Sequence, residues 1–577
     1  MQPDQPNLTI AVLQCNFTVG DVWANARVMA NGYAQAVANG ATLVVAPEHA
    51  LCGYPPKDNL RHDAFLNENA MAAGWLASVI GSVPLAFGMP RKAPRAGDYG
   101  QKSYNSYVVA QSGRIVFATN KVYLAQGGVF DEWRVHKPGT FKIFTYNGLR
   151  IGFPICEDIW HDRVVNQMVR KGVDLFIVPN GSPEYVGKPA RRHAIVAAHV
   201  KRTGIPMLYV NHVGAQDENA FGGGAFYVNG SEADATVFLP YWKEAIGMVN
   251  LTVSGKEGYF SLPDGTETYT VSNPIRFMLD AAVMTTRDYI LKSSSIRKVV
   301  VAVSGGIDSA VVLAMAIMAV GRENVIAISL PSMHNTSTTK GFAQQLCDNL
   351  GVQLHWWDIG DTITALRSKY EDVFGHPLKV PGDTAYENTQ SRERGQIVMA
   401  IANRQHAMLL STGNKSEMAM GYATLYGDMN GGFNPLKTIY KTSVYQVAYA
   451  INEALANGNS ANDALGYEAI PVALITQRPS AELDDDQFDE NSLPAYPVLD
   501  AILTRFIDEG MDPADIIRHG LSPLTYLYGN VASSTFTLMK MDSNKPAMQQ
   551  WLKTVDASGR HESYIVSPQC VVEVVRR

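Results

Sequence analysis

The apolar run Val299–Val303 is followed at once by Ser304-Gly-Gly-Ile-Asp-Ser309 and then by an apolar stretch, residues 310–320. An apolar run, a short turn with two glycines and a helical stretch are the beginning of a βα unit. Glycines let the backbone approach a ligand closely, and the free amides at a helix start, with two serine hydroxyls, are donors to an anion. The segment therefore predicts a parallel α/β sheet with a phosphate site at the end of this strand.

The phosphate loop lacks the lysine of G-x-x-x-x-G-K-[ST] loops, where that cation binds the β- and γ-phosphates. The turn instead contains Asp308, which is suited to holding Mg²⁺ against a pyrophosphate. In this respect the segment resembles the N-type ATP pyrophosphatases, which split ATP into AMP and pyrophosphate while they adenylate a substrate. A Ser-Gly-Gly sequence also occurs in ordinary turns, so the motif alone leaves both interpretations open.

With 577 residues the chain is too long for one ordinary hydrophobic core, which predicts two domains or three. Its 46% hydrophobic and 18% charged residues are a globular composition, and the net charge of −6 argues against a nucleic-acid partner. The five cysteines show no CxxC spacing, so we expect neither a zinc site nor a disulfide framework, as in a reducing cytoplasm. Residues 1–7 lack a signal pattern, and the longest helical apolar run, 311–320, is too short to span a membrane. We therefore expect a cytoplasmic protein without a membrane partner.

The first 250 residues alternate short β-rich runs with helical segments such as 24–39, which predicts a layered α/β domain over residues 1–250. Turn-rich sequence follows and predicts a linker over residues 251–280. A second α/β set then predicts a doubly wound, mostly parallel sheet in a domain over residues 281–577. Strands are expected at residues 8–13, 42–46, 107–110, 150–155, 175–178, 207–210, 299–303, 325–329 and 407–411.

Three polar segments follow or end apolar runs in the first half, where catalytic groups project in a layered α/β domain. They contain Glu48, Lys121 and Cys156. A thiolate nucleophile needs a base that takes its proton, and a cation or amides that stabilise the oxyanion on the attacked carbonyl. A lone cysteine after a strand is also a common inert core residue, so only the three segments together favour catalysis.

The order and setting of these segments resemble the nitrilase superfamily of carbon-nitrogen hydrolases, which fold as an αββα sandwich. By this resemblance Glu48 is the general base, Lys121 stabilises the tetrahedral intermediate and Cys156 is the nucleophile that forms a thioester. Glu132 would orient Lys121 as the second glutamate of that family does. The resemblance thus implies an amidase.

Further matches extend the resemblance to the glutaminase domains of this superfamily. Ser182 and Lys188 stand where relatives hold the amide substrate. Gly127 stands where many relatives carry an aromatic residue that lines glutamine, so this wall is reduced to backbone. The resemblance implies that Gly127, Ser182 and Lys188 bind glutamine.

The second half contains a long run from Thr412 to Asp428, followed by spaced lysines. Small residues that can approach a nucleotide, a carboxylate for a metal and lysines for phosphates suit a dinucleotide together with ATP. The run closely resembles the NAD synthetases, and the whole chain resembles the glutamine-dependent members of that family. Such enzymes adenylate the nicotinate carboxylate of deamido-NAD with ATP, and ammonia then displaces AMP to give NAD in the last step of NAD biosynthesis.

The resemblance implies a role for each matching residue of the second half. Those implied to bind ATP are Ser304, Gly305, Gly306, Asp308, Ser309 and Thr412. Those implied to bind deamido-NAD are Asn388, Glu417, Asp428, Lys437, Lys441 and Lys545. Mg²⁺ would lie on Asp308 and Glu417. A solvated helix face is the alternative for Lys437 and Lys441, and two basic residues that related bacterial enzymes carry around Lys545 are absent here.

Uniting the two chemistries in one chain has a physical reason. Free ammonia at neutral pH is mostly ammonium, which has no lone pair for attack, so a local source shielded from water is an advantage. We therefore expect an internal passage for ammonia from Cys156 to the Ser304 loop. The resemblance also implies a homo-oligomer built on dimers of the synthetase domain, with glutamine, ATP and deamido-NAD as small-molecule partners.

Two alternatives stay open at this point. In the first, one half has lost catalysis and acts as a regulatory or scaffolding module, against which the intact acidic, basic and thiol residues argue. In the second, the enzyme amidates another carboxylate or a carbonyl, as do GMP synthetases and tRNA-modifying enzymes with the same loop. Those enzymes lack the Thr412–Asp428 run.

Overall fold

The computed structural model describes residues 8–541, except 95–99, 128–129, 231–233, 255–256, 272, 294, 381–383, 457–467, 481, 485–486, 492, 519–525 and 533–534. The chain divides into two compact units, Met1–Lys292 and Ser293–Arg577. Within the described residues no helix combines the length and the apolar character needed to cross a membrane.

Two sheets form the centre of the first unit. Their strand orders are β17-β16-β1-β2-β3-β4-β5 and β15-β14-β11-β10-β9-β8. The first sheet consists of β1 (Leu8–Gln14), β2 (Leu43–Val45), β3 (Leu85–Lys92), β4 (Ser103–Gln111), β5 (Arg114–Asn120), β16 (Ala245–Ser254) and β17 (Glu257–Ser261). The second consists of β8 (Ile143–Tyr146), β9 (Leu149–Gly152), β10 (Leu175–Asn180), β11 (Met207–Asn211), β14 (Phe226–Val228) and β15 (Ala235–Val237). Two short hairpins pair β6 (Gln126–Gly127) with β7 (Phe130–Asp131), and β12 (Val213–Gln216) with β13 (Asn219–Gly222).

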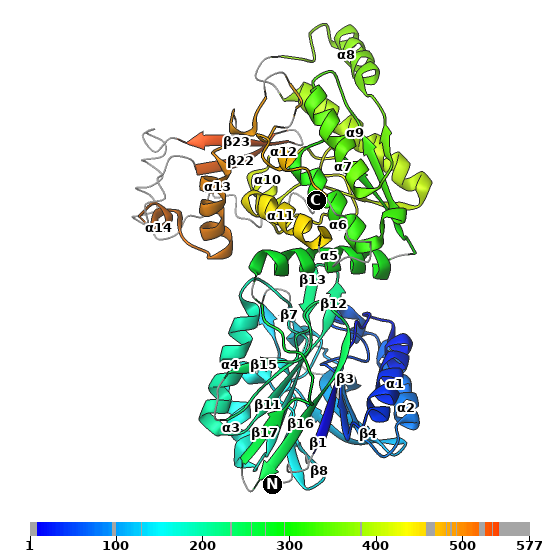
Figure 1. The fold of residues 1–577 in the computed structure, drawn as a ribbon, viewed down its shortest axis with the longest axis vertical. Coiled ribbons are helices and arrows are strands. Elements are labelled where there is room, and N and C mark those ends of the chain that lie inside the picture. The colour runs from blue at the N-terminus through cyan, green and yellow to red at the C-terminus, as the bar shows by residue number, and fades with distance from the viewer. Residues whose placement is uncertain are drawn as a thin grey trace. The chain divides into compact units, whose positions relative to one another are not determined.

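A pair of helices covers the outer face of each sheet (Figure 1). The helices are α1 (Val22–Ala38) and α2 (Asp63–Val79) on the first sheet, and α3 (Asp162–Arg170) and α4 (Lys188–Thr203) on the second. Between the sheets lies a hydrophobic core in which Ile10 and Val109 of the first sheet pack with Ile177 and Val210 of the second. The predicted αββα sandwich is confirmed.

The strands of this unit follow the apolar runs of the sequence. β10 and β11 are buried over their whole length because they are covered on both faces, which explains their unbroken apolar sequences. Every segment predicted as a strand in this half overlaps a strand, and the helical segment 24–39 corresponds to α1.

Gly88 of β3 allows a close approach of the loop that follows β2. A Cβ atom on Gly88 would lie 2.0 Å from His49 N and 2.6 Å from the carbonyl carbon of Glu48. Gly88 N–H donates to Pro47 O at 3.1 Å, and Leu51 N–H donates to Gly88 O at 3.1 Å. The loop with Glu48 and His49 thus rests directly on the backbone of β3, where only glycine leaves room.

Residues 251–280, predicted as a linker, contain the end of β16, the strand β17 and the first turns of α5 (Pro274–Ser293). β17 pairs antiparallel with β16 as an edge strand of the first sheet. The buried Asp288 joins α5 to the first unit, because its carboxylate accepts from Asn16 Nδ2 at 2.8 Å and from Ala215 N at 2.7 Å. Where one functional domain ends and the other begins stays a prediction.

The second unit is built on four parallel strands in the order β20-β19-β18-β21. They are β18 (Lys298–Ala302), β19 (Val325–Ser329), β20 (Leu354–Trp356) and β21 (Ala407–Leu410). The order along the sheet reverses at β18, which has β19 on one side and β21 on the other. Loops diverge at such a switch point and leave a crevice beyond the carboxyl ends of the strands. The predicted parallel α/β sheet is confirmed, and it positions the loops after β18 and β21 at that crevice.

Helices surround this sheet (Figure 1). α6 is almost entirely apolar and buried because it packs on β18, β19 and α11. Val300 of β18 belongs to a second hydrophobic core, which it shares with residues of α8 and α9. The helices are α6 (Ile307–Val320), α7 (Ser337–Leu350), α8 (Gly360–Phe374), α9 (Ala385–Gln405), α10 (Lys415–Met420), α11 (Lys441–Ala456), α12 (Val472–Ile475), α13 (Tyr496–Leu503) and α14 (Pro513–Arg518), followed by the hairpin of β22 (Tyr526–Ala532) and β23 (Thr535–Met541).

Replacing Gly88 by alanine is expected to destabilise the protein by about 3 kcal/mol, because the new methyl group would overlap backbone atoms of the Glu48 loop. Urea denaturation of G88A beside the wild type measures the difference. Gly74→Ala is the matched control: Gly74 lies in α2 with nothing within 4 Å of its Cβ position. This change is expected to raise stability by about 0.5–1 kcal/mol. A G88A protein as stable as the wild type would contradict the close approach.

Candidate functional site

Glu48, Lys121 and Cys156 lie in three loops that follow strands. Glu48 lies after β2, Lys121 directly follows β5, and Cys156 begins the short helix η3 (Cys156–Trp160) after β9. Glu48 and Lys121 are completely buried and Cys156 is 4% exposed. The structure brings the three together: Lys121 pairs with Glu48 at 2.8 Å, and both lie close enough to Cys156 to shift the pKa of its thiol.

The ammonium group of Lys121 is held between two carboxylates. Its Nζ donates to Glu48 Oε1 at 2.8 Å and pairs with Glu132 Oε2 at 2.7 Å. Asn105 Nδ2 donates to both carboxylates, 2.6 Å from Glu48 Oε1 and 3.2 Å from Glu132 Oε1. Gly181 N–H donates to the second oxygen of Glu48 at 2.7 Å. Each buried charge therefore has partners, without which its removal from water would be too costly.

The environment makes the two carboxylates unequal. Burial raises the pKa of Glu48, and this effect together with the charge of Glu132 outweighs the opposing effect of Lys121. Burial also acts on Glu132, but its ion pair with Lys121 outweighs this effect and lowers the pKa of that carboxyl. For Lys121 burial is outweighed by the two glutamates, so its pKa is raised well above its ordinary value. Glu132 thus keeps Lys121 charged, and Glu48 is the better proton acceptor.

Cys156 starts from the thiol form. Burial raises its pKa well above the usual value, the carboxylate of Glu48 raises it further, and Lys121 lowers it. Its φ of +47° lies in the left-handed region, which is uncommon and strained for a residue other than glycine. The thiol needs an adjacent base before it can attack a carbonyl, and Glu48 is suited to that task.

Asp158 connects the loop of Lys121 with the turn of Cys156. Its Oδ1 accepts from Val122 N at 3.1 Å and from Tyr123 N at 2.8 Å, and its Oδ2 accepts from Ile155 N at 3.0 Å. Burial raises the pKa of Asp158 to about 7, although the three amides lower it. This carboxyl group therefore fixes Lys121 relative to the nucleophile.

The residues predicted to bind glutamine lie at different places around this group. Ser182 is buried next to Gly181, whose amide binds Glu48. Lys188 lies partly buried at the start of α4, with its ammonium 4.5 Å from the centre of the Trp160 ring. Gly127 is exposed in β6, with φ +87°. Ser182 thus lies close to the catalytic group, and the glutamine contacts of all three residues stay predictions.

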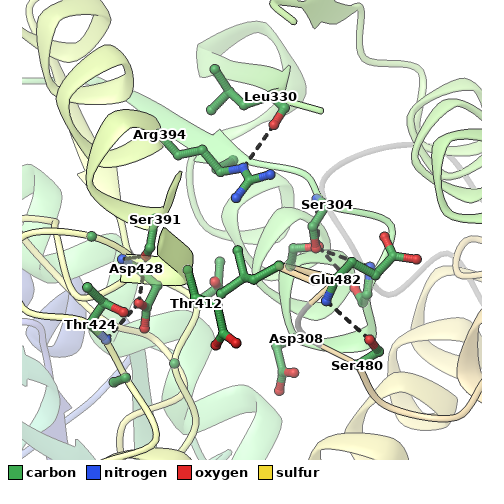
Figure 2. A pocket seen from close by; sticks show the side chains of 18 of the residues that line it. Ser304, Asp308, Leu330, Ser391, Arg394, Thr412, Thr424, Asp428, Ser480 and Glu482 are labelled. Carbon is green, nitrogen blue, oxygen red and sulfur yellow. Dashed lines mark hydrogen bonds between the residues drawn. The ribbon is translucent and has the colours of Figure 1, made fainter. Parts of the chain in front are cut away.

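A cavity of about 1050 Å³ lies in the second unit (Figure 2). It opens beyond the carboxyl ends of β18, β19 and β21, since Val303, Ser329 and Leu410 form part of its wall. A volume of this size lies at the upper end of small-molecule sites, which suits a dinucleotide together with ATP. The predicted residues that line it are Ser304, Gly306, Asp308, Ser309, Asn388, Thr412, Glu417, Asp428 and Lys441.

Two further predicted residues, Gly305 and Lys437, lie outside the lining of the cavity. Gly305 is part of the loop but not of the lining; its φ is +88°, and a Cβ there would lie 2.1 Å from Thr339 O. Lys437 lies outside the lining, with its ammonium 5.7 Å from the centre of the Phe433 ring. Lys545 lies outside the described residues.

The loop at Ser304 is shaped by its own hydroxyl groups. Ser309 Oγ donates to Gly306 O at 2.9 Å and lies 3.2 Å from Ser304 Oγ, which accepts from Gly306 N at 3.2 Å. α6 starts at Ile307, directly after this loop, and its first residues line the cavity. The free N–H groups of a helix start therefore lie at the wall of the cavity, as an anion site requires.

Lys441 links the two predicted metal ligands. Its ammonium forms ion pairs with Asp308 and, at 3.2 Å, with Glu417 Oε1. Asn414 binds both carboxylates as well: its Nδ2 donates to Asp308 at 3.0 Å and its N–H to Glu417 at 3.2 Å. No cluster of three or more His, Cys, Asp and Glu that could hold a metal occurs among the described residues. The protein thus supplies two carboxylates here, bridged by an ammonium.

A polar network forms another wall of the cavity. Asp428 accepts from Ser391 Oγ at 2.9 Å and from Thr424 N at 2.8 Å, and Thr424 Oγ1 donates to Asn388 Oδ1 at 2.7 Å. Figure 2 shows Ser391, Thr424 and Asp428 together on one side and Ser304 on the other. The network fixes Asn388 and Asp428 at the end of the cavity away from the phosphate loop.

Several residues of the two sites were not among those predicted from the sequence. Asn105, Asp158 and Asn414 each bind loops together through their side chains and were missed as site residues. The available signal for Asn105 was a polar side chain inside a strand that is otherwise buried. Arg394 of α9 lines the cavity and donates through Nε to Leu330 O at 2.9 Å (Figure 2).

Comparison with known protein families gives two matches that divide the chain. Residues 9–255 match the carbon-nitrogen hydrolases, and residues 278–534 match NAD synthase. A glutamine-dependent NAD(+) synthetase of Rhodobacter capsulatus is 38% identical over 518 residues, which cover 89% of this chain and 91% of the relative. A relative of the same name from Thermotoga maritima is 34% identical over 551 residues, 90% of this chain and 92% of the relative.

Solved structures agree with these matches. The glutamine-dependent NAD+ synthetase of Acinetobacter baumannii, solved in complex with ADP, has a TM-score of 0.73 and 33% identity, and covers 89% of this chain and 90% of that chain. The glutamine-dependent NAD(+) synthetase of Cytophaga hutchinsonii has a TM-score of 0.72 over 90% of this chain and 89% of that chain. At 20% identity this second likeness supports the fold alone.

Replacing Lys121 by methionine is expected to lower the free energy of unfolding by about 3–5 kcal/mol, because two buried carboxylates lose their cation. The difference in the free energy of unfolding between Lys121→Met and the wild type is expected to become smaller as the pH falls. Unpaired buried carboxylates have raised pKa values, so the folded variant binds more protons than the unfolded chain and gains stability on acidification. Urea denaturation at several pH values measures both effects.

The matched control for this change is Lys57→Met. Lys57 pairs with Asp217 at 2.7 Å, and both side chains are about half exposed. Loss of such a surface pair is expected to cost at most about 1 kcal/mol. If Lys121→Met were no more costly than Lys57→Met, the buried charge set would not have the structural role described here.

Proposed function

Because this chain belongs to the family of glutamine-dependent NAD(+) synthetases, we propose that its two units carry two linked reactions. The chain is a ligase that forms NAD in an ATP-dependent reaction with glutamine as the nitrogen source. In the proposal the first unit releases ammonia from glutamine. The second unit adenylates the nicotinate carboxylate of deamido-NAD, and ammonia displaces AMP, so that the products are NAD, AMP, pyrophosphate and glutamate.

One observation carries this assignment of roles. The buried set of Glu48, Lys121 and Glu132 acts on the thiol of Cys156, in the same chain as a cavity of dinucleotide size with a phosphate loop in its wall. Neither feature alone defines the reaction. Together they provide a source of ammonia and a place where a carboxylate can be activated.

Glu48 is the general base of the amidase reaction. It takes the proton of Cys156 as the sulfur attacks the carboxamide carbon of glutamine, and Lys121 stabilises the negative charge that develops on the oxygen. Glu48 then gives the proton to the departing nitrogen, so ammonia leaves and a thioester remains. A water molecule deprotonated by Glu48 hydrolyses the thioester and releases glutamate. Glu132 keeps Lys121 charged and in place throughout.

The loop from Ser304 to Ser309 binds the phosphates of ATP through its amides and hydroxyls and through the start of α6. An oxygen of the nicotinate carboxylate attacks the α-phosphorus and pyrophosphate leaves. The acyl carbon then carries AMP, a far better leaving group than oxide, and ammonia replaces it. Thr412, two residues after β21, lies against ATP, while Asn388 and Asp428 face the dinucleotide.

The carboxylates of Asp308 and Glu417 suit Mg²⁺, a hard cation that prefers oxygen ligands and is often shared between protein carboxylates and phosphates. Bound there, Mg²⁺ would neutralise the charge that builds up on the phosphates. Lys441, which pairs with both carboxylates, provides a second positive charge at the same place. Contacts of Lys437 and Lys545 with the dinucleotide phosphates are part of the same proposal.

We also propose that ammonia passes between the two reactions without release into solution, because protonation in water would remove its lone pair. A cytoplasmic location and an assembly built on dimers of the synthetase domain complete the proposal. The reducing cytoplasm suits a catalytic thiol, and the described cysteines Cys15, Cys52, Cys156 and Cys347 are all free.

Replacing Cys156 by alanine is expected to reduce glutamine-supported NAD formation by at least about a thousandfold, because no thioester can form. Ammonium-supported NAD formation is expected to persist within about twofold, since the adenylation site is untouched. Assays with ATP, deamido-NAD and either nitrogen source, with NAD as the readout, separate the two activities. Equal loss of both activities would contradict the division of labour.

The complementary variant is Asp308→Asn. It is expected to lower NAD formation from both nitrogen sources by about a hundredfold or more, because a charge at the phosphate site is lost. Release of glutamate from glutamine is expected to persist. Loss of glutamine-supported NAD formation alone would place Asp308 outside the adenylation site, and a wild-type protein that forms no NAD from either source would reject the proposed function.

The pH dependence of glutamate release is expected to show an acid limb with a midpoint above 4.5, the ordinary pKa of glutamate. Burial raises the pKa of Glu48, and only the deprotonated carboxylate accepts the thiol proton, so the rate falls as the pH drops through that value. The measurement is kcat/KM for glutamine between pH 4 and 8. Asn105→Ser removes a hydrogen bond that lowers the pKa of Glu48, so its midpoint is expected at higher pH. A midpoint at or below 4.5 would argue against Glu48 as the base.

A further inference from the structure

Two buried histidines lie beside the catalytic carboxylates and have no part in the chemistry described above. His49 Nε2 and His136 Nε2 are 3.1 Å apart, and the planes of the two rings differ by 14°. His49 is completely buried and His136 is 1% exposed. A nitrogen–nitrogen distance of this length is a hydrogen bond, in which one ring donates its N–H and the other accepts.

The histidine pair connects the two loops that carry the carboxylates. His49 directly follows Glu48, and His136 N–H donates at 2.7 Å to the carbonyl of Glu132 at the start of η2 (Glu132–Arg134). The two histidines are 87 positions apart in the sequence. The bond between them therefore links the loop of Glu48 to the loop of Glu132. Lys121 links the same two loops a second time, through its ion pairs with both carboxylates.

The two rings are held to different degrees. His136 Nδ1 lies 2.9 Å from Ser103 Oγ at the start of β4, so this ring is anchored on both sides. His49 Nδ1 has no hydrogen-bond partner among the described residues. The bond to His136 is thus the hydrogen bond that fixes the His49 ring, next to a packing contact with Tyr54 whose ring centre is 6.1 Å away.

The backbone at His49 makes this fixation necessary. Its φ is +50°, in the left-handed region that costs energy for a side chain other than glycine. Below it Gly88 leaves no room for the loop to settle closer to the sheet. A loop in a strained conformation persists only where its surroundings hold it, and the side chain of His49 provides such a hold one residue from the base Glu48.

Both rings are neutral in this environment. Burial lowers the pKa of each, that of His136 to about 4, and the facing charge of Lys121 lowers both further, while Glu132 raises that of His136. The remaining titratable group that acts on His49 is His212, which lowers its pKa as well and whose Nε2 lies 2.5 Å from the backbone carbonyl of Glu48. A neutral imidazole has one nitrogen that donates and one that accepts, so one Nε2 can donate a hydrogen bond to the other.

We propose that His49 and His136 are positioning residues of the amidase reaction: their Nε2–Nε2 hydrogen bond holds the loops of Glu48 and Glu132 at the spacing at which both carboxylates engage Lys121. This inference rests on the proposed role of Glu48 as the base. Because both rings are buried, they act in this proposal through the loops and not on glutamine itself. Displacement of the Glu48 loop would lengthen the path of the proton from Cys156, and a misplacement of about 1 Å can cost a hundredfold in rate.

Two substitutions of His136 separate positioning from mere space filling. A glutamine amide reaches the position of Nε2, so His136→Gln keeps a partner for His49. An asparagine amide reaches only the position of Nδ1, so His136→Asn keeps the contact with Ser103 and loses the bond to His49. For glutamate release we expect His136→Asn to lower kcat by about thirtyfold with KM for glutamine within about threefold, and His136→Gln to stay within about threefold of the wild type.

The same pair of changes at His49 tests the bond from its other end. His49→Asn is expected to lower kcat as His136→Asn does, and His49→Gln to restore most of it. Ammonium-supported NAD formation, measured on all four variants, is expected to stay within about twofold of the wild type, which shows that the adenylation site is intact; activity of the glutamine variants shows that the first unit has folded.

The inference is overturned if asparagine and glutamine have equal effects at both positions, because the Nε2 contact would then be irrelevant. It is also overturned if KM rises while kcat is unchanged, because the rings would then act on glutamine binding. Should His136→Asn lose the ammonium-supported activity too, the two variants of His49 decide, since His49 Nδ1 makes no hydrogen bond with the described residues that a substitution could disturb. Failure of Cys156→Ala to behave as expected would instead reject the amidase chemistry itself.

Discussion

A buried lysine ammonium between two carboxylates is the interaction on which the first unit depends. Moving these three charges out of water costs several kcal/mol for each ion, so the group exists only where every charge is matched and hydrogen-bonded. Lys121 meets this condition through contacts of 2.7 and 2.8 Å to Glu132 and Glu48, with Asn105 binding both. The loops after β2, β5 and β9 therefore have to converge, and the two sheets provide the rigid frame that brings them together.

The second unit repeats this arrangement with other residues. Lys441 stands between Asp308 and Glu417 as Lys121 stands between Glu48 and Glu132, and Asn414 binds both carboxylates as Asn105 does. The two groups differ in their exposure to solvent. The Lys121 group is sealed, which creates one carboxylate of raised pKa beside a thiol. The Lys441 group lines a large cavity, so its carboxylates and its ammonium can meet phosphates and a cation from solution.

The architecture was predictable because strands buried on both faces leave unbroken apolar runs, and because loops after parallel strands gather at one edge of a sheet. Those two rules predicted the position of the Ser304 loop at the crevice, and the order of Glu48, Lys121 and Cys156 predicted the group that the structure brings together and that we propose as the amidase site. What failed to show in the sequence were contacts between side chains far apart in the chain. Asn105, Asp158 and the His49–His136 pair have no spacing that marks them, since their partners are set by how the sheets pack.

The segment 251–280 shows a second limit of structure prediction from sequence. Its turn-rich sequence predicted a connection, yet β17 lies within it as the last strand of the first sheet. An edge strand has one neighbour and often one solvated face, so it needs neither an apolar run nor strong β-formers. β17 is only five residues long, with Tyr259 and Phe260 as its β-forming residues, so its local sequence is a weak signal and its pairing with β16 defines the strand.

The ion pairs of Lys441 have a consequence for how nucleotides are bound. A tethered ammonium competes with any dissolved cation for the two carboxylates, because its attachment to α11 gives it a high effective concentration. Under the proposed function, arrival of a nucleotide and its metal is an exchange of electrostatic partners, and the free energy of binding is the difference between two favourable sets of contacts. The protein recovers its own set when AMP and pyrophosphate depart. A built-in counter-ion therefore favours turnover over tight retention of products.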